Sequence, residues 1–429
     1  MTERAGPAPG GRLLLGAWCA VSESAAALAT LRAALAGRQS GTRRDLDERL
    51  ARRFVAEPGA LWLHAASVGE VTALAPLVDR LRARADAPAL LVTTSTVTGR
   101  ARAAARCDVP AQLAPLDAPG VVRRFLGLAR PRAHVAVETE LWPVRLRELA
   151  ARAIPAVLVS ARLSPERLPR YRRARGLYAP TLACLSGIAP ASEADAGRLA
   201  GLGADPARFG PIGNLKWDAA PAPPSVAQRD ALREELGLDP QRPWVVLGSV
   251  HPGEAGPVVA GLRADSAGPP AGVLVAPRHP QRFDRVADEL ASAGHRAWRA
   301  SRGPAPPGTT VVLVDRMGVL AALYALADAA LLGGTLVPVG GHSPLEAAAA
   351  GCPLVAGPHV GHQLDLVEPL ERAGALVRVA DAGEAARALA RLLADPDARR
   401  RAGDAARDEV ARRRGHADRL AGWVLEMIR

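Results

Sequence analysis

The chain contains very little lysine and asparagine. Its 429 residues include one of each, Lys216 and Asn214, although lysine and arginine together number 55. Arginine replaces lysine readily at a surface, where only a solvated positive charge is needed, but a planar guanidinium does not replace a compact ammonium in a tight site. Because the two rare residues also lie two positions apart, we interpret Lys216 as a functional ammonium rather than as a lysine left by chance.

Cysteine and aromatic residues are also scarce. No Cys-x-x-Cys pair occurs among the four cysteines, which are Cys19, Cys107, Cys184 and Cys352. Their scatter argues against a zinc site and a disulfide scaffold, and it favours a reducing compartment. Aromatic side chains make up 3% of the residues, so we expect no stacking platform and no nucleic-acid partner.

The apolar run at the N-terminus is short. Residues 13–21 form a run of nine residues, whereas a membrane-spanning helix needs about 20. We expect residues 13–36 to form a helix that lies on a membrane; the alternative is an ordinary packed terminal helix. The net charge of +12 fits nucleic acid, an anionic membrane surface or a phosphorylated substrate.

Short apolar runs alternate with longer segments of helical periodicity. The expected strands are residues 60–64, 89–94, 133–137, 156–160 and 185–190, and then 244–248, 272–276, 310–314, 329–332 and 353–356. This alternation predicts parallel sheets with helical crossovers, and the length predicts two doubly wound domains. The proline-rich segment 219–225 reads as a linker, which would place Lys216 at the mouth of an interdomain cleft.

Two strands of the first half end in carboxylates. Glu70 lies in the first helical turn after strand 60–64, where it suits a general base aimed into a cleft; the alternative is a carboxylate that stabilises the helix N-terminus. Glu138 and Glu140 follow strand 133–137. We expect one of them to be structural, for instance paired with an arginine.

Strand ends of the second half carry groups that suit an anion. Ser249 lies in a Ser/Gly turn that opens a helix, and Arg278 and His279 follow the next strand. Backbone N–H groups, a guanidinium and an imidazole at such positions suit a phosphate. Neither a P-loop, nor a Gly-x-Gly-x-x-Gly after the first strand, nor metal-ligand spacing occurs, so no dinucleotide cofactor or metal is expected.

The glycine-rich segment 333–346 carries the strongest signal of the second half. Its glycines permit close approach of the backbone to a ligand. We expect Ser343 to cap a helix whose first turn contains Pro344, with Glu346 completing a capping box. In the functional alternative, Glu346 accepts hydrogen bonds from ribose hydroxyls while the helix N-terminus holds a phosphate.

An arginine-rich segment follows strand 156–160. Its arginines are Arg162, Arg167, Arg170, Arg172, Arg173 and Arg175. Such a run is usually a solvated face. Because leucine and tyrosine interleave with these arginines, the alternative is a surface that docks an anionic lipid headgroup or a polyphosphorylated acceptor.

Together these segments resemble the Kdo transferases, which add 3-deoxy-D-manno-octulosonic acid (Kdo) to the lipid A precursor of lipopolysaccharide. The resemblance covers the chain from about residue 40 to the end. It rests on segments in the family's order, namely His64–Glu70, Glu138–Pro143, Ala161–Ser164, Gly213–Asp218, Pro277–Pro280 and Gly333–Glu346.

The resemblance implies a two-domain GT-B fold with Rossmann-like domains facing a central cleft. It also implies an inverting transfer, without a metal or other cofactor, from CMP-Kdo to a lipid A precursor (lipid IVA). Glu70 matches the catalytic base, and Glu138 and Lys216 match residues that stabilise the transition state. The matching CMP-binding positions are Pro277, Arg278, Met317, Gly318, Val319, Ser343, Pro344, Leu345 and Glu346.

Further residues are expected near the ligands. Around the donor phosphate these are Ser249, His279, Gly341 and His342, and toward the acceptor headgroup they are Ser67, Arg162, Arg170 and Arg173. The chain departs from the family pattern where serine replaces asparagine at 160 and 343, valine replaces glutamate at 319, and valine replaces threonine at 250.

The expected organisation follows from these assignments. It comprises a membrane-associated or packing helix (1–40), the acceptor domain (41–218), the linker (219–228), the donor domain (229–400), and C-terminal helices packed against the first domain (401–429). We expect the protein at the cytoplasmic face of the bacterial inner membrane. The alternatives are another GT-B enzyme with a different donor or acceptor, or a basic protein that binds membrane or nucleic acid.

Overall fold

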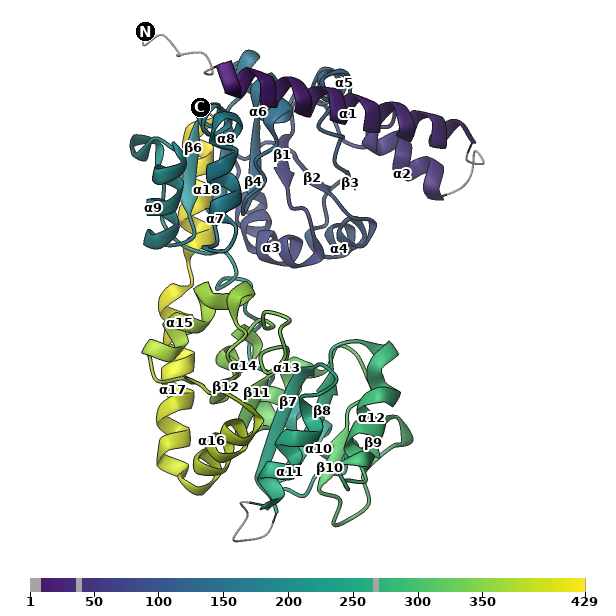
Figure 1. The fold of residues 1–429 in the computed structure, drawn as a ribbon, viewed down its shortest axis with the longest axis vertical. Coiled ribbons are helices and arrows are strands. Elements are labelled where there is room, and N and C mark those ends of the chain that lie inside the picture. The colour runs from purple at the N-terminus through teal and green to yellow at the C-terminus, as the bar shows by residue number, and fades with distance from the viewer. Residues whose placement is uncertain (1–8, 36–40, 265–269, 429) are drawn as a thin grey trace. The chain divides into compact units, whose positions relative to one another are not determined.

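The computed structural model describes residues 9–35, 41–264 and 270–428. It divides into two compact units, coloured along the chain in Figure 1. Unit 1 is Met1–Ala219 with Arg413–Arg429, and unit 2 is Ala220–Arg412. Residues 1–8 and 36–40 of the predicted N-terminal helix lie outside the described residues.

Unit 1 is built on a six-stranded parallel sheet in the order β3-β2-β1-β4-β5-β6. This order is that of a doubly wound Rossmann-like fold, so the predicted class is confirmed for this unit. All residues of its central strands are buried, as expected where helices cover both faces. The strands are β1 (Leu61–His64), β2 (Leu90–Thr94), β3 (Ala111–Leu113), β4 (Ala133–Val137), β5 (Ala156–Ala161) and β6 (Gly187–Pro190).

Unit 1 has a hydrophobic core on each face of this sheet, because side chains alternate along β1. Trp62 belongs to one core, and Leu61 and Leu63 to the other. The helices are α1 (Pro9–Leu35), α2 (Gly41–Arg49), α3 (Val68–Arg82), α4 (Val97–Cys107), α5 (Pro119–Ala129), α6 (Pro143–Ala151), α7 (Leu168–Arg173), α8 (Arg175–Leu182), α9 (Glu193–Leu202), η1 (Pro206–Arg208) and α18 (His416–Met427).

Unit 2 contains a seven-stranded parallel sheet in the order β13-β12-β11-β7-β8-β10-β9. Its strands are β7 (Trp244–Val250), β8 (Gly272–Pro277), β9 (Trp298–Arg299), β10 (Val311–Leu313), β11 (Ala329–Leu332), β12 (Leu354–Ala356) and β13 (Leu376–Arg378). Its helices are α10 (Val226–Glu235), α11 (Ala255–Ala264), η2 (Pro280–Arg282), α12 (Phe283–Ser292), η3 (Ala300–Arg302), α13 (Leu320–Leu326), α14 (Leu345–Ala350), η4 (Gly361–Gln363), α15 (Leu364–Arg372), α16 (Ala382–Ala394) and α17 (Pro396–Arg413).

All ten predicted strands are present, with ends shifted by up to two residues. Three strands were not predicted: β3, β9 and β13. Each is two or three residues long and lies at an edge of its sheet. Such short edge strands carry too few apolar residues for a periodic signal.

The C-terminal helices differ from the expected division at residue 401. Helix α17 belongs to unit 2, apart from its last residue. Gly403 lies so close to the carbonyl oxygen of Gly351 that a Cβ there would approach it to 2.4 Å. Helix α18 belongs to unit 1, where it contacts α3 and contributes Leu420 and Val424 to the core that contains Leu61 and Leu63.

Helix α1 lies across one end of unit 1, where it contacts α2, α5 and α8 (Figure 1). Trp18 donates a hydrogen bond to Asp117 at 2.8 Å, while apolar side chains such as Leu13 and Val21 are 77% and 72% exposed. By length and composition the segment Leu13–Arg32 can cross a membrane, which the run of nine residues alone cannot, and 6% of it is buried. The helix is thus attached to the protein by one side only.

The packing of α18 yields a stability prediction. Leu420 is fully buried, and its replacement by alanine leaves a cavity in the core of unit 1. We expect Leu420→Ala to lower the free energy of unfolding by about 2–5 kcal/mol, measured by urea denaturation. Glu426→Ala, at an exposed position of the same helix, should change it by less than about 0.5 kcal/mol. Equal effects of the two variants would contradict the assignment of α18 to this core.

Candidate functional site

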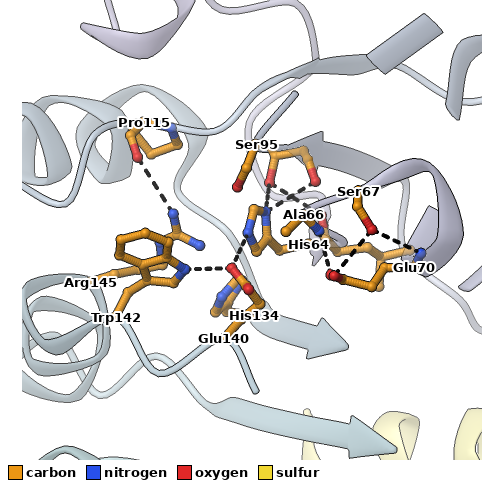
Figure 2. Close-up of polar contacts among 12 residues, drawn as sticks. His64, Ala66, Ser67, Glu70, Ser95, Pro115, His134, Glu140, Trp142 and Arg145 are labelled. Atoms are coloured by element: carbon orange, nitrogen blue, oxygen red, sulfur yellow. Dashed lines mark hydrogen bonds and ion pairs between the residues drawn. The ribbon is translucent and has the colours of Figure 1, made fainter. Parts of the chain in front are cut away.

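Glu70 is held where β1 ends and α3 begins. Ser67 caps α3, and its hydroxyl oxygen accepts a hydrogen bond from the backbone N–H of Glu70. The Glu70 carboxylate in turn accepts from the backbone N–H of Ala66 at 2.6 Å and from the Ser67 hydroxyl at 3.2 Å (Figure 2). The N-terminus of α3 therefore fixes the position of this carboxylate.

The pKa of Glu70 is raised from 4.5 to about 7. Burial is the largest cause, followed by repulsion from Glu138 and Glu140, and together they outweigh the stabilising hydrogen bonds from Ala66 and Ser67. A carboxylate whose pKa lies near the working pH can both take up and release a proton. Glu70 thus has the protonation behaviour of a general base.

Glu138 and Lys216 form an ion pair close to this carboxylate. The distance between Lys216 Nζ and Glu138 Oε1 is 2.7 Å, and the two side chains are 20% and 24% exposed, so a ligand can reach them. Glu138 follows β4 with φ of 58°, in the left-handed region that non-glycine residues seldom adopt. Strain of this kind persists where the surrounding structure holds it and is frequent at functional sites.

The loop that carries Lys216 explains the single asparagine. The Asn214 side-chain oxygen accepts a hydrogen bond from the backbone N–H of Lys216 at 2.9 Å, which is an Asx turn. The Ser160 hydroxyl accepts from the backbone N–H of Leu215, also at 2.9 Å. At the end of the loop, Asp218 accepts from the first backbone N–H groups of α18, at Gly415 and Ala417. The two rare residues therefore act together: Asn214 shapes the turn that presents Lys216.

Glu140 is the structural carboxylate of the pair. Its carboxylate accepts from Trp142 Nε1 at 2.5 Å and lies 3.0 Å from His64 Nε2 (Figure 2). Burial alone would raise the pKa of Glu140, but the hydrogen bonds from His64 and Trp142 outweigh it and the pKa is lowered. The expected arginine partner is therefore wrong: a histidine and an indole hold this group.

The sequence did not predict His64 as the partner of Glu140. His64 is fully buried, and its pKa is lowered by burial and by Arg145, so the ring is neutral. Its Nε2 lies 3.0 Å from the Glu140 carboxylate, and its Nδ1 lies 2.9 Å from the hydroxyl and 3.0 Å from the carbonyl oxygen of Thr93. A histidine at the end of the otherwise apolar strand β1 was the available signal.

Buried Arg145 supplies positive charge to the same region. Its guanidinium is 2% exposed and lies over the rings of Trp62 and Trp142, at 5.2 and 5.5 Å from their centroids. Burial raises the pKa of Asp117 and Arg145 opposes this shift, while Arg145 also helps to lower the pKa of Glu140. It forms no direct ion pair with either carboxylate in the described structure. The charge behind the carboxylates is thus held by aromatic rings rather than by a carboxylate partner.

Unit 2 contains a cavity of about 380 Å³ beside the ends of β7 and β8. Most of the predicted donor residues line it: Ser249, Pro277, Arg278, Met317, Gly318, Val319, His342, Ser343 and Glu346. Ala276, Arg316, Leu320 and Ala321 line it as well and were not predicted. Burial raises the pKa of Glu346, and Arg278 opposes this shift. The cavity therefore combines a guanidinium, a carboxylate and small polar groups.

The predicted capping box at this cavity is wrong. Helix α14 begins at Leu345, its N-cap is Pro344 and no side-chain cap bond forms. Ser343 Oγ accepts from the backbone N–H of Leu345 at 3.4 Å, whereas in the expected capping box it would accept from the backbone N–H of Glu346. Because Glu346 is not used for capping, its carboxylate is left to face the cavity.

Four predicted donor residues do not line this cavity. Pro344 and Leu345 are buried behind it, Gly341 bonds to the carbonyl of Gly334, and exposed His279 lies 6.3 Å from the ring of His251. In unit 1, Arg170 and Arg173 lie on the exposed face of α7. The carbonyl of Arg162 accepts a hydrogen bond from the Thr139 hydroxyl, between Glu138 and Glu140.

Comparisons with known proteins agree with this architecture. The family model "3-Deoxy-D-manno-octulosonic-acid transferase (kdotransferase)" matches residues 44–219, and "Glycosyl transferases group 1" matches residues 309–409. The chain is 35% identical to the 3-deoxy-D-manno-octulosonic acid transferase of Bordetella pertussis over 85% of this chain and 87% of that one. It is 34% identical to the enzyme of that name from Haemophilus influenzae, over 85% and 86% of the two chains.

Solved structures support the fold alone. HepE from Anabaena, in complex with UDP and glucose, has a TM-score of 0.58 at 16% identity and covers 86% of this chain and 99% of that one. Together with the two parallel sheets, this defines a two-domain glycosyltransferase of the GT-B type. The chain belongs to the 3-deoxy-D-manno-octulosonic acid transferase family, whose members transfer Kdo in lipopolysaccharide synthesis.

The raised pKa of Glu70 has a consequence for stability. A carboxyl whose folded-state pKa lies above its unfolded value stabilises the fold below the unfolded pKa and loses this contribution as pH rises through the folded pKa. For Glu70 this window is about pH 4.5 to 7. We therefore expect Glu70→Gln to raise the free energy of unfolding by about 1–3 kcal/mol at pH 8 and not at pH 4, measured by chemical denaturation.

Glu193→Gln is the matched control for this prediction. Glu193 also lies in the first turn of a helix of unit 1, behind a serine N-cap, but it is exposed. It should show no such gain at pH 8. A Glu70→Gln variant that is equally destabilised at both pH values would mean that the carboxylate is not strained by burial.

Proposed function

We propose that this protein transfers Kdo from CMP-Kdo to a lipid A precursor, with inversion at the anomeric carbon and without a metal cofactor. Membership of the Kdo transferase family supports the transferred sugar. The observation that carries the mechanism is the raised pKa of Glu70, about 7, beside the Glu138–Lys216 ion pair. The acceptor and the base belong to unit 1 and the nucleotide to unit 2.

Glu70 removes the proton of the acceptor hydroxyl in this proposal. Its ionised form is disfavoured by burial and by two neighbouring carboxylates, so it gains from taking up a proton. The hydroxyl oxygen then attacks the anomeric carbon of Kdo as the bond to the CMP phosphate breaks. Because attack and departure occur on opposite faces of the sugar, a single displacement inverts the configuration.

Lys216 supplies positive charge to the reacting groups. Kdo carries a carboxylate and CMP a phosphate, so the donor is anionic at two points close to the bond that breaks. A preorganised ammonium stabilises negative charge that develops on the leaving phosphate, or it holds the sugar carboxylate in place. Glu138 keeps the ammonium fixed through the 2.7 Å ion pair.

The cavity of unit 2 holds CMP in this proposal. Arg278 and the polar groups at the ends of β7 and β8 suit the phosphate, and Glu346 suits the ribose hydroxyls. Val319, which stands where the family usually has glutamate, lies at the N-cap of α13 without a side-chain cap bond. We propose that this position contacts the nucleotide through its backbone.

Helix α1 and the arginine-rich α7 attach the enzyme to the cytoplasmic face of the inner membrane in this proposal. The exposed apolar residues of α1 supply hydrophobic area, and exposed arginines, including Arg170 and Arg173, supply charge for anionic headgroups. A lipid acceptor makes such a location necessary for turnover. Binding of the purified protein to anionic but not to neutral vesicles would support this part of the proposal.

The proposed activity is tested by incubating the purified protein with CMP-Kdo, generated in situ, and lipid A precursor. Mass spectrometry of the lipid product counts the Kdo residues added. Addition of one or more Kdo residues supports the proposal. A protein that binds UDP but not CMP, and leaves the lipid unchanged, would contradict it.

The base is tested by Glu70→Ala. We expect transfer to fall by about 10²-fold to 10⁴-fold, because proton removal is lost, while CMP affinity measured by calorimetry stays unchanged. Glu193→Ala removes the exposed first-turn carboxylate of α9 and should keep full transfer. Normal turnover in Glu70→Ala would rule out Glu70 as the base.

Lys216→Arg tests the ammonium at constant charge. We expect turnover to fall at least about tenfold, because the guanidinium is larger and cannot keep the same contact with Glu138. The reverse exchange at an exposed position of unit 1, Arg84→Lys, should be silent. If Lys216→Arg is also silent, any positive charge suffices and the lysine has no special role.

A further inference from the structure

A buried carboxylate in unit 2 ties two loops of the donor cavity together. Glu254 is fully buried and accepts backbone hydrogen bonds from His251, Gly334, Thr335 and Leu336, at 2.8 to 3.0 Å. The first of these donors follows β7, and the other three open the glycine-rich loop after β11. The loop that carries His251 and the loop that ends at His342 are therefore held in a fixed arrangement.

Three side chains form a hydrogen-bonded chain across these loops. Arg282 Nη1 lies 2.5 Å from His251 Nδ1, and His251 Nε2 lies 2.9 Å from His342 Nε2. The two imidazole rings are nearly parallel, with an angle of 14° between their planes and centroids 5.1 Å apart. His251 is 8% exposed, whereas His342 lines the donor cavity.

The arginine at one end fixes the tautomer of both histidines. A guanidinium only donates hydrogen bonds, so His251 Nδ1 must accept from Arg282. In a neutral His251 the proton is then on Nε2, which donates to His342 Nε2. His342 Nε2 accepts in turn, so a neutral His342 carries its proton on Nδ1.

Both rings are neutral at physiological pH. Burial is the largest cause that lowers the pKa of His342, to about 4, and Arg278 and neighbouring histidines add to it. Burial and Arg282 likewise lower the pKa of His251. A chain of neutral, polarised donors therefore ends at the cavity wall.

We propose that Arg282 and His251 are positioning residues that hold His342 in its Nδ1–H form, so that His342 donates a hydrogen bond to the phosphate of the bound sugar nucleotide. This rests on the proposed function, because it takes the cavity to be the CMP site. His342 Nε2 is occupied by His251, which leaves Nδ1 for a ligand. Arg278 and Ser249 line the same cavity and suit the same anion. As the phosphate leaves, its charge increases, and a fixed neutral donor stabilises it without carrying a charge of its own.

The tautomers can be observed without any ligand. Histidine side-chain nitrogen shifts and one-bond N–H correlations, recorded by NMR on the full-length protein at pH 7.5, should show Nε2–H for His251 and Nδ1–H for His342. The latter is the less common form in free histidine, so its dominance indicates a relay. Assignment uses His251→Gln and His342→Gln. If both rings carry their proton on Nε2, or if either is an imidazolium, the relay does not exist.

The binding test compares two substitutions of His251. Alanine removes the relay, and we expect the CMP dissociation constant to rise about tenfold, the size expected for loss of one hydrogen bond to a charged group. Glutamine can keep it, because its amide oxygen accepts from Arg282 while its N–H donates to His342. His251→Gln should therefore stay within about threefold of the wild type. His295→Gln, a histidine of unit 2 outside the cavity lining, is the control.

A double variant shows whether His251 acts through His342. His251→Ala/His342→Ala should bind CMP no more weakly than His342→Ala alone, because groups that act as a unit are not additive. Additive losses, or an unchanged dissociation constant in His251→Ala, would overturn the relay. If the wild type does not bind CMP, the proposed function and the phosphate role fail together, whereas the NMR measurement still decides the tautomers.

Discussion

The burial of Glu70 among other carboxylates is the constraint on which the site of unit 1 depends. Burial and the charges of Glu138 and Glu140 raise the pKa of Glu70 to about 7. Each neighbour keeps its place through a different partner: Lys216 holds Glu138, and His64 with Trp142 holds Glu140. Without these partners the repulsion would be relieved by movement or by protonation, and the base would lose its poised pKa.

The two units use a related device with different outcomes. In each, a glutamate in the segment after a central strand accepts a backbone N–H from the strand-end loop: Glu70 from Ala66, and Glu254 from His251. Glu254 is fully buried and its oxygens accept four backbone hydrogen bonds, so it is satisfied and serves to hold loops. Glu70 accepts two hydrogen bonds, one from the backbone N–H of Ala66 and one from the hydroxyl of Ser67, and it is partly exposed. The number of donors thus separates a structural carboxylate from a reactive one.

Much of the fold and part of the site could be predicted from the sequence. The long apolar strands were found because buried parallel strands are continuous in sequence, and the Glu70, Lys216 and Arg278 segments were found because they follow strands or retain a rare residue. The hydrogen-bonded pairs that involve histidine could not be predicted. His64 and Glu140 are 76 residues apart in the sequence, and His251 and His342 are 91 residues apart. Only the sheet order brings such pairs together. Asn214 had no assigned role until its Asx turn to Lys216 was seen.

The charge state of Glu70 is the property that most directly tests this mechanism. Carbon-13 NMR of the side-chain carboxyl, in protein labelled at glutamate and assigned with Glu70→Gln, follows its titration between pH 4 and pH 9. We predict a midpoint of about 7, as burial beside two carboxylates requires. A midpoint near the ordinary value of 4.5 would contradict it, because Glu70 would then be a permanently ionised carboxylate of the helix N-terminus with little tendency to take a proton.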